Sequence, residues 1–327
     1  MFKLGLCQMK VTADKAENLR HAGELIRQAA AQGANVVTLP EMFNCPYENA
    51  CFPVYGEPAG GESWQFLSGI AKELGIYLIG GSVPELEDGK IYNTSYIFSP
   101  EGKELARHRK VHLFDIDVPG GQRFMESDTL TAGDSVTVID TEYGKIAVAI
   151  CFDIRFSDFF RVMGDMGAQL IVIPAAFNMT TGPIHWDLAF RMRALDQQCF
   201  IAGCSPARDT SASYVAYGHS LVVNPWGEII DQLDERPAAI SFAFPGPADY
   251  PNGIIGGQLL NFPAFREGVA LGPYLKKKFS MPVYINNDGD LYAYGEALGG
   301  LLPEVNEMLD DYGNRKRYRN LVGFTLG

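Results

Sequence analysis

Short apolar runs with the spacing of β-strands alternate with amphipathic stretches of helical periodicity along most of this chain. Near the N-terminus, residues 2–9 predict a strand, residues 14–32 a helix, and "NVVTLPE" (35–41) a buried strand. The alternation continues with predicted helices at 64–74, 156–166 and 184–197, and predicted strands at 76–81, 91–98, 168–176 and 199–205. Such alternation predicts a layered α/β domain in which helices cover the faces of a sheet. Chemically active groups would then lie at strand ends.

The composition and the hydrophobic periodicity of the sequence change near residue 238. Residues 244–265 are rich in proline and glycine and carry no long periodic segment. We therefore expect a first domain over residues 1–238 and a different segment over 239–327. Within that segment the pattern predicts a helix at 266–279, a strand at 282–287 and a helix from about residue 290.

Charge and cysteine content restrict the class of protein. The chain carries 27 Lys and Arg against 39 Asp and Glu, a net charge of −12, which argues against nucleic acid as a partner. No apolar run is long enough to span a bilayer, and the N-terminus lacks the features of a signal peptide. The six cysteines form no C-x-x-C pair, as is typical of a reducing compartment. We expect a cytoplasmic protein.

The stretch "KIAVAICFDIRF" (145–156) is an apolar strand that ends on a cysteine and then turns polar. Cys151 between a strand and the start of a helix can be a nucleophile, because a helix N-terminus stabilises a thiolate. It can also be a packing residue, since buried cysteine behaves as a small hydrophobe. Taken alone, the stretch favours packing, because a nucleophile also needs a base and an electrostatic partner.

Two charged residues at the ends of other predicted strands are candidates for these partners. Glu41 closes the apolar run "VVTLPE", and Lys110 is flanked by strand-like residues in "ARHRKVHLFD". Each alone is compatible with a structural or solvated side chain. If both meet Cys151 at one substrate carbonyl, the glutamate can move the proton and the lysine can stabilise the oxyanion. Spacing alone does not bring the three together.

Three motifs, "LPEMF", "HRKVHLFD" and "AICFDIRF", resemble the signature stretches of the nitrilase superfamily of carbon–nitrogen hydrolases in order and spacing. Others are similar to its omega-amidase branch, among them "FMESDTLTAGDS", "AAFNMTTGPIHW" and "YGHSLVVNPWGE". The resemblance spans nearly all of residues 1–237. It implies a nitrilase-type αββα sandwich, in which two sheets lie between two layers of helices.

The resemblance also implies a role for each matching residue. Cys151 matches the nucleophile, Glu41 the general base that takes its proton and later activates water, and Lys110 the cation that stabilises the tetrahedral intermediate. Glu126 matches a second glutamate that supports the lysine and helps to position the substrate. The backbone N–H of Phe152, where omega-amidases usually have tyrosine, completes the oxyanion hole. The family needs neither a metal nor an organic cofactor.

Omega-amidases act on small dicarboxylic acid monoamides such as 2-oxoglutaramate and succinamate, so the resemblance implies a small-molecule amide substrate. A substrate of that class needs a cation for its distal carboxylate, and Arg155 is one candidate. The alternative for Arg155 is a structural ion pair with Asp153 or Asp158. The remaining pocket candidates, for which core packing is an alternative where the ring is aromatic, are Tyr47, His185 and Trp186.

From about Ala239 the resemblance changes. The stretches "SFAFPGPADYPNGIIGGQLLNFPAF" and "PVYINNDGDLYAYGEALGG" resemble an interior piece of ROK-family sugar kinases, which implies a truncated α/β fold of the actin-like ATPase type. Asn287 and Asp288 match that family's sugar-binding asparagine and catalytic-base aspartate. The phosphate loops and zinc cluster of such kinases have no counterpart here, so little is left to stabilise a transferring phosphoryl group. We expect residues 239–327 to be a fragment without independent function.

The sequence thus predicts a cysteine-dependent, omega-amidase-like hydrolase that works through a thioester. Three alternatives stay open: another amidase or nitrilase specificity on the same Glu-Lys-Cys site, a sugar kinase, or an inactive chimera. Members of the family are commonly homodimers. Here the segment from about Ala239 stands where they have a last strand and a tail that packs at the dimer interface, so the sequence leaves a homodimer open.

Overall fold

The computed structural model describes residues 2–117, 123–244, 248–249 and 254–255. The chain divides into two units, the first covering Phe2–Ala243 and the second the residues from Phe244 onward. In the second unit the described strands are β16 (Ala248–Asp249) and β17 (Ile254–Ile255), which pair antiparallel. The helices and strand predicted after residue 265, and the kinase-like residues Asn287 and Asp288, lie outside the described residues.

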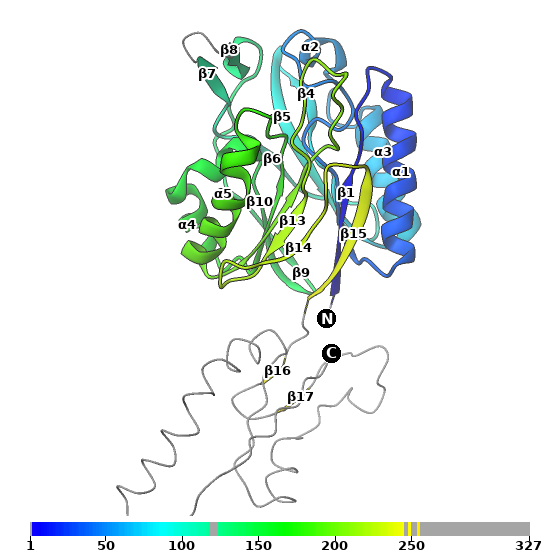
Figure 1. Cartoon of the computed structure of the whole chain (residues 1–327). Helices are drawn as coiled ribbons and strands as arrows, with labels where there is room; N and C mark the ends of the chain where they lie inside the picture. The colour runs from blue at the N-terminus through cyan, green and yellow to red at the C-terminus, as the bar shows by residue number, and fades with distance from the viewer. Residues whose placement is uncertain (1, 118–122, 245–247, 250–253, 256–327) are drawn as a thin grey trace, which may run out of the picture. The chain divides into compact units, whose positions relative to one another are not determined.

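Two mixed sheets, each containing parallel and antiparallel pairs of strands, form the interior of the first unit (Figure 1). The first sheet contains seven strands: β1 (Phe2–Gln8), β2 (Val36–Thr38), β3 (Tyr77–Ile79), β4 (Val83–Glu87), β5 (Lys90–Phe98), β6 (Glu104–Arg109) and β15 (Ala238–Phe244). The second contains six: β9 (Thr137–Thr141), β10 (Gly144–Val148), β11 (Leu170–Pro174), β12 (Phe200–Cys204), β13 (Leu221–Val223) and β14 (Ile229–Gln232). A separate hairpin joins β7 (Asp115–Asp117) to β8 (Arg123–Met125).

Helices cover the outer face of each sheet, which gives the predicted αββα order of layers (Figure 1). The first sheet is covered by α1 (Lys15–Ala31) and α3 (Glu62–Leu74), and the second by α4 (Ser157–Asp165) and α5 (Gly182–Gln197). The short helices are α2 (Phe52–Tyr55), η1 (Glu126–Asp128) and η2 (Cys151–Arg155). Among the described residues, none of the helices combines the length and the apolar character that crossing a bilayer requires.

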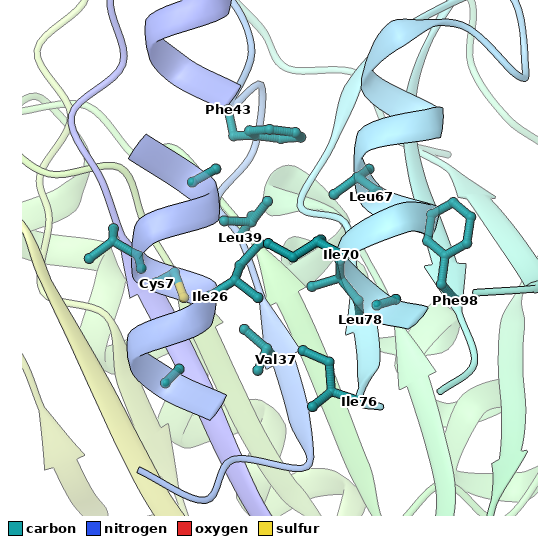
Figure 2. Packing of buried hydrophobic residues seen from close by; sticks show 14 of the residues in the cluster. Cys7, Ile26, Val37, Leu39, Phe43, Leu67, Ile70, Ile76, Leu78 and Phe98 are labelled. Carbon is teal, nitrogen blue, oxygen red and sulfur yellow. The ribbon is translucent and has the colours of Figure 1, made fainter. Parts of the chain in front are cut away.

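The apolar periodicity of the helices explains why they lie where they do. Asp14 caps α1 by accepting the Glu17 N–H at 3.1 Å, and the helix then buries one face against the first sheet. Figure 2 shows this core, in which Ile26 of α1 and Ile70 of α3 meet Leu78 of β3. The predicted helices at 14–32, 64–74, 156–166 and 184–197 are confirmed to within two residues at every end.

Strand direction brings the candidate site residues to one end of the first unit. In the first sheet β2 and β3 are parallel, and β5 is antiparallel to both β3 and β6, so β6 runs in the same direction as β2. Glu41 and Lys110 follow these two strands and therefore emerge at the same edge. In the second sheet β10, β11 and β12 are parallel, and Cys151 follows the carboxyl end of β10.

The first unit does contain the last strand that we expected to be replaced. Residues Ala238–Phe244 form β15, which lies beside β1 at the edge of the first sheet. The physical reason is that "AAISFAF" contains β-branched and aromatic residues that favour a strand. The residues that would interrupt a strand, Pro245 and Gly246, come only after it. The first unit therefore extends to Ala243, beyond the predicted boundary at 238.

Candidate active site

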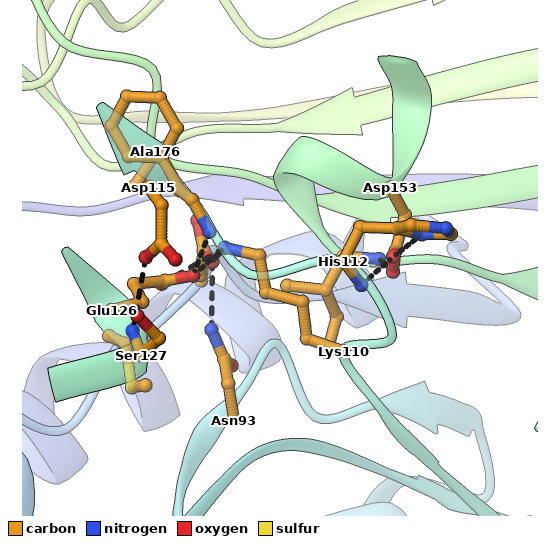
Figure 3. Close-up of polar contacts among 12 residues, drawn as sticks. Asn93, Lys110, His112, Asp115, Glu126, Ser127, Asp153 and Ala176 are labelled. Atoms are coloured by element: carbon orange, nitrogen blue, oxygen red, sulfur yellow. Dashed lines mark hydrogen bonds and ion pairs between the residues drawn. The ribbon is translucent and has the colours of Figure 1, made fainter. Parts of the chain in front are cut away.

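Lys110 lies between two carboxylates in the interior of the first unit. Its Nζ is 2.8 Å from Glu41 Oε1 and 2.9 Å from Glu126 Oε2, and all three side chains are fully buried (Figure 3). Burial by itself would lower the pKa of Lys110, but the carboxylates of Glu126 and Glu41 outweigh it and raise that pKa. The ammonium therefore stays charged, and the structure brings together three residues that are far apart in the sequence.

A close approach of two loops holds Glu41 in place. A Cβ atom at Gly81 would lie 2.3 Å from the Pro40 carbonyl oxygen, and the φ of Gly81 is +58°, so glycine is needed there. The following residue, Ser82, donates its N–H to Pro40 O at 3.2 Å and accepts the Met42 N–H on its hydroxyl at 3.0 Å. The backbone on both sides of Glu41 is thus anchored.

Two polar side chains restrain one oxygen of Glu41. Asn93 Nδ2 donates to Glu41 Oε1 at 2.8 Å, and the Tyr47 hydroxyl lies 3.3 Å from the same atom. The other oxygen, Oε2, is buried and accepts no hydrogen bond from an N–H or O–H group of the described residues. Glu41 therefore keeps one oxygen available for a proton.

Glu126 is fixed from several sides. The Tyr47 hydroxyl donates to its Oε1 at 2.5 Å, and the Phe114 N–H donates to its Oε2 at 2.6 Å. Burial raises the pKa of Glu126, against the opposing effect of Lys110. Burial, followed by the charges of Glu126 and Glu41, raises the pKa of Tyr47 well above its ordinary value, so the phenol stays neutral.

Cys151 begins η2 with a backbone φ of +45°, a conformation that costs a non-glycine residue about 1–3 kcal/mol and is concentrated at functional sites. The possibility that a helix N-terminus stabilises a thiolate here does not hold, because η2 is a short 3₁₀ helix and α4 begins only at Ser157. Burial, and then the charge of Glu41, raise the pKa of Cys151 well above its ordinary value, although Lys110 opposes this. The resting thiol therefore carries its proton.

Two backbone N–H groups belong to the surroundings of Cys151. The N–H of Ala176, just after β11, hydrogen-bonds to the Cys151 sulfur. Phe152 follows Cys151 in η2, and its ring packs edge-on against Phe114 at 5.3 Å between centroids. Phenylalanine in place of tyrosine at position 152 removes only the ring hydroxyl, so the backbone N–H donor is retained.

Arg155 is exposed, and its guanidinium lies over the Phe177 ring at 5.9 Å from the centroid. Neither of the ion pairs considered for it forms, because Asp153 is buried with other partners and Asp158 lies 3.5 Å from Arg161. Among the described residues, no carboxylate lies within ion-pair distance of Arg155.

His185 lies with its Nδ1 2.5 Å from an Nη of Arg155. Partial burial, and then the charge of Arg155, lower the pKa of His185, so the imidazole is neutral and can accept this hydrogen bond. Trp186 instead lies in the core of the second sheet with no exposed area, and its Nε1 donates to His219 O at 2.7 Å. The structure therefore places His185 beside the site and Trp186 in the packed interior.

A cavity of about 300 Å³ reaches Glu41 from the segments that follow β1 and β12. Glu41, Tyr47 and Ala176 contribute to its wall, together with the loop of residues 206–216. Within that loop the Tyr214 ring packs against Tyr47 at a tilt, with 4.5 Å between centroids, and its hydroxyl donates to Ala176 O at 2.5 Å. Cavities of this size accept small organic ligands. Among the described residues, no group of His, Cys, Asp and Glu side chains is arranged to hold a metal ion.

Sequence reasoning missed Asn93 and the loop residue Tyr214. Asn93 stands in "IYNTS", within a predicted strand, and a polar side chain in such a run is the one signal that it faces a site. Tyr214 gave no such signal, because it lies in the irregular stretch between β12 and β13.

The chain is similar in sequence to known proteins over most of its length. The sequence profile of the family described as carbon-nitrogen hydrolase matches residues 3–243. Omega-amidase NIT2 of Homo sapiens is 52% identical over 239 residues, which cover 73% of this chain and 87% of that protein. Omega-amidase NIT2-A of Xenopus laevis is 54% identical over 240 residues, with the same coverage of 73% and 87%.

Solved structures are similar in fold. The crystal structure of Saccharomyces cerevisiae Nit3, described as a member of branch 10 of the nitrilase superfamily, has a TM-score of 0.69 and 42% identity, covering 74% of this chain and 89% of that one. An amidase from Nesterenkonia sp. AN1, whose active-site cysteine carries an acrylamide adduct, has a TM-score of 0.65 and 24% identity, covering 75% and 94%. The latter supports the fold alone.

Proposed function

This chain belongs to the carbon-nitrogen hydrolase family, and on that premise we propose that it is an omega-amidase, which hydrolyses the terminal amide of a small dicarboxylic acid monoamide to the acid and ammonia. The family match confirms the predicted nitrilase-type α/β fold. The observation that carries the proposal is the buried Lys110 between Glu41 and Glu126, beside Cys151. The family profile ends at residue 243, so it gives no support to the kinase-like segment, and we assign the reaction to the first unit alone.

In the first half-reaction, we propose, Glu41 Oε2 accepts the Cys151 thiol proton while the sulfur attacks the amide carbon. The raised pKa of Cys151 supports this order, since a thiol that rests protonated needs a base. Lys110 Nζ and the Phe152 N–H stabilise the resulting oxyanion. When the C–N bond breaks, Glu41 returns its proton to the leaving nitrogen, so that ammonia departs and a thioester remains.

In the second half-reaction Glu41 accepts a proton from a water molecule, whose oxygen attacks the thioester carbon. The C–S bond then breaks, the proton returns to the sulfur, and the carboxylic acid departs. Glu126 takes no proton in this scheme. Its contacts with Lys110 and Tyr47 support a role in holding the ammonium between substrate and base.

Arg155 is the best-supported anchor for the distal carboxylate of the substrate. It has no carboxylate partner among the described residues, and it lies near enough to Cys151 that a negative charge on the sulfur would raise the pKa of Arg155. His185 accepts one of its hydrogen bonds and so orients the guanidinium. A planar guanidinium binds a carboxylate through two parallel hydrogen bonds.

We therefore expect succinamate to be hydrolysed with a kcat/KM about 10- to 100-fold above that of butyramide, which has the same amide but no distal carboxylate. Arg155→Leu should remove most of this preference by slowing succinamate and leaving butyramide nearly unchanged. Ammonia release at steady state measures both. Faster turnover of a nitrile or a carbamoyl compound than of succinamate would point to another specificity of the family. An unchanged preference in Arg155→Leu would exclude Arg155 as the anchor.

We also propose that the chain forms a homodimer through α5. Four apolar side chains spaced at helical intervals form an exposed stripe along this helix: Ile184, Leu188, Met192 and Leu195. Trp226, which is 72% exposed, extends this apolar surface. It lies in a turn next to α5, because Arg191 of that helix donates a hydrogen bond to the Gly227 carbonyl. A second copy of the chain, packed through the same surface, would bury the stripe and Trp226.

The six free cysteines, five of them buried, support our expectation of a reducing, cytoplasmic setting.

Leu188→Glu should convert the dimer to a monomer, because it places a charge in the middle of the apolar stripe. Sedimentation velocity of the full chain measures the change. Val54→Glu is the matched control, since Val54 is an apolar residue at least as exposed as Leu188 but lies on α2. A wild-type chain that sediments as a monomer at micromolar concentration would refute the interface.

A further inference from the structure

The carboxylate of Asp153, two residues after Cys151, is fully buried and accepts five hydrogen bonds. Oδ1 accepts the Val111 N–H at 3.2 Å, the His112 N–H at 2.9 Å and His112 Nδ1 at 2.9 Å. Oδ2 accepts the Ile150 N–H at 3.0 Å and His108 Nε2 at 3.2 Å. The reaction scheme above uses none of these contacts.

The donors come from both sides of the sandwich. Val111 and His112 directly follow Lys110, at the carboxyl end of β6 in the first sheet. Ile150 directly precedes Cys151, at the carboxyl end of β10 in the second sheet. One carboxylate therefore joins the chain segment that carries the ammonium to the segment that carries the thiol. Figure 3 shows Asp153 facing His112 beside Lys110.

The same carboxylate holds the strained turn at the thiol. Besides receiving the Ile150 N–H, Asp153 donates its own N–H to Ile150 O at 3.0 Å, which closes a tight loop around Cys151. The φ of +45° at Cys151 persists only if its surroundings enforce it. Nothing else in the described turn bonds to the Ile150 N–H.

We propose that Asp153 is a positioning residue, which fixes the place of the Cys151 sulfur relative to Lys110 by bonding to the backbone next to each. The proposal deepens the amidase function proposed above and rests on it. Asp153 touches neither the substrate nor the reacting atoms. It acts by keeping sulfur and ammonium in register for attack on one carbonyl.

Only an ionised carboxylate can satisfy these donors. Both of its oxygens accept, whereas an amide presents an oxygen on one side and an NH₂ group on the other. In Asp153→Asn the NH₂ group must face either the Ile150 N–H or the N–H groups of Val111 and His112. Burial by itself would raise the pKa of Asp153, but the hydrogen bonds from His108 and His112 outweigh it and lower that pKa. The wild-type carboxylate thus stays charged.

Asp153→Asn should lower kcat for succinamate about 100-fold and leave KM within about twofold, because a displacement of the order of 1 Å costs that much in rate. Ile154→Val is the matched control. It removes one buried methyl group from the same turn, and it should lower thermal stability with little change in kcat. A kcat within threefold of wild type in folded Asp153→Asn would overturn the proposal. So would an unchanged kcat with a raised KM, which would make Asp153 a binding residue.

Alkylation of the thiols by iodoacetamide tests the positioning role of Asp153 without any amide turnover. Asp153→Asn should slow labelling of Cys151 about tenfold, because the sulfur loses its alignment with Glu41 and Lys110. Cys51, which is partly exposed and outside the site, should label at the wild-type rate. Peptide mass spectrometry separates the two. Faster labelling of every cysteine would show general loosening and overturn the proposal. Should the wild-type chain release no ammonia from any monoamide, the proposed function fails while this readout still stands.

If Asp153→Asn does not fold, His112→Ala and His112→Asn replace it. Alanine removes the ring donor to Oδ1, whereas the asparagine NH₂ group can take the place of Nδ1. We expect a loss in kcat of about tenfold for His112→Ala and recovery to within about threefold of wild type for His112→Asn. Equal activity in the two variants would overturn the proposal, since the bond to Asp153 would then have no effect on rate.

Discussion

Cys151→Ala should release ammonia from succinamate at least about 10⁴-fold more slowly than the wild-type chain, because removal of a nucleophile leaves only binding and oxyanion stabilisation. Its fold should be intact. Cys151 is small, and alanine removes only the sulfur from a turn whose backbone is held by Asp153. Ammonia release under saturating substrate measures the rate, and a thermal melt checks the fold.

The matched control is Cys204→Ala. Cys204 is as buried as Cys151 and donates its thiol to Cys7 O at 3.5 Å, but it lies at the end of β12 with no contact to Lys110. Its loss should cost stability and leave the rate per folded molecule unchanged. Equal rates in Cys151→Ala and the wild type would remove Cys151 from the mechanism, and with it the thioester.

The layers of the fold could be predicted because each element carries its own signal. The buried face of α1 repeats at helical spacing, and β11 is an uninterrupted apolar run. Signals of this kind are weak in β4, which contains Pro84 and two glutamates, and in β6, which is largely charged. These strands form because each pairs with its neighbour along the chain, β5, and the composition of a strand alone does not show the stabilisation that its partner supplies.

The site was only partly predictable for the same reason. Glu41 and Lys110 drew attention as charges that close apolar runs, and their resemblance to family motifs supplied the roles. Asp153 was considered only as a partner for Arg155, since its real partners on the far sheet are 41 to 45 residues away in sequence. The raised pKa of Cys151 could not be predicted from its own stretch of sequence, because it depends on burial and on the distant Glu41.

Lys110→Met should lower the free energy of unfolding by about 3–5 kcal/mol, because it leaves the buried carboxylates of Glu41 and Glu126 without their shared cation. Ammonia release should fall about 10³-fold, since the oxyanion loses its charged donor. Methionine matches the lysine stem in length, so the change is chiefly one of charge. Urea denaturation and the ammonia assay measure the two effects.

The stability deficit of Lys110→Met should depend on pH. Burial already raises the pKa of Glu126 in the wild type, and without Lys110 to oppose it that pKa rises further. A carboxyl group whose folded pKa lies above its unfolded value destabilises the fold once it ionises, so the deficit should be larger at pH 8 than at pH 5. Lys110→Met/Glu126→Gln removes one of the two negative charges and should regain part of the stability, but none of the activity. A double variant as unstable as Lys110→Met at pH 8 would show that lost packing, rather than unpaired charge, causes the deficit.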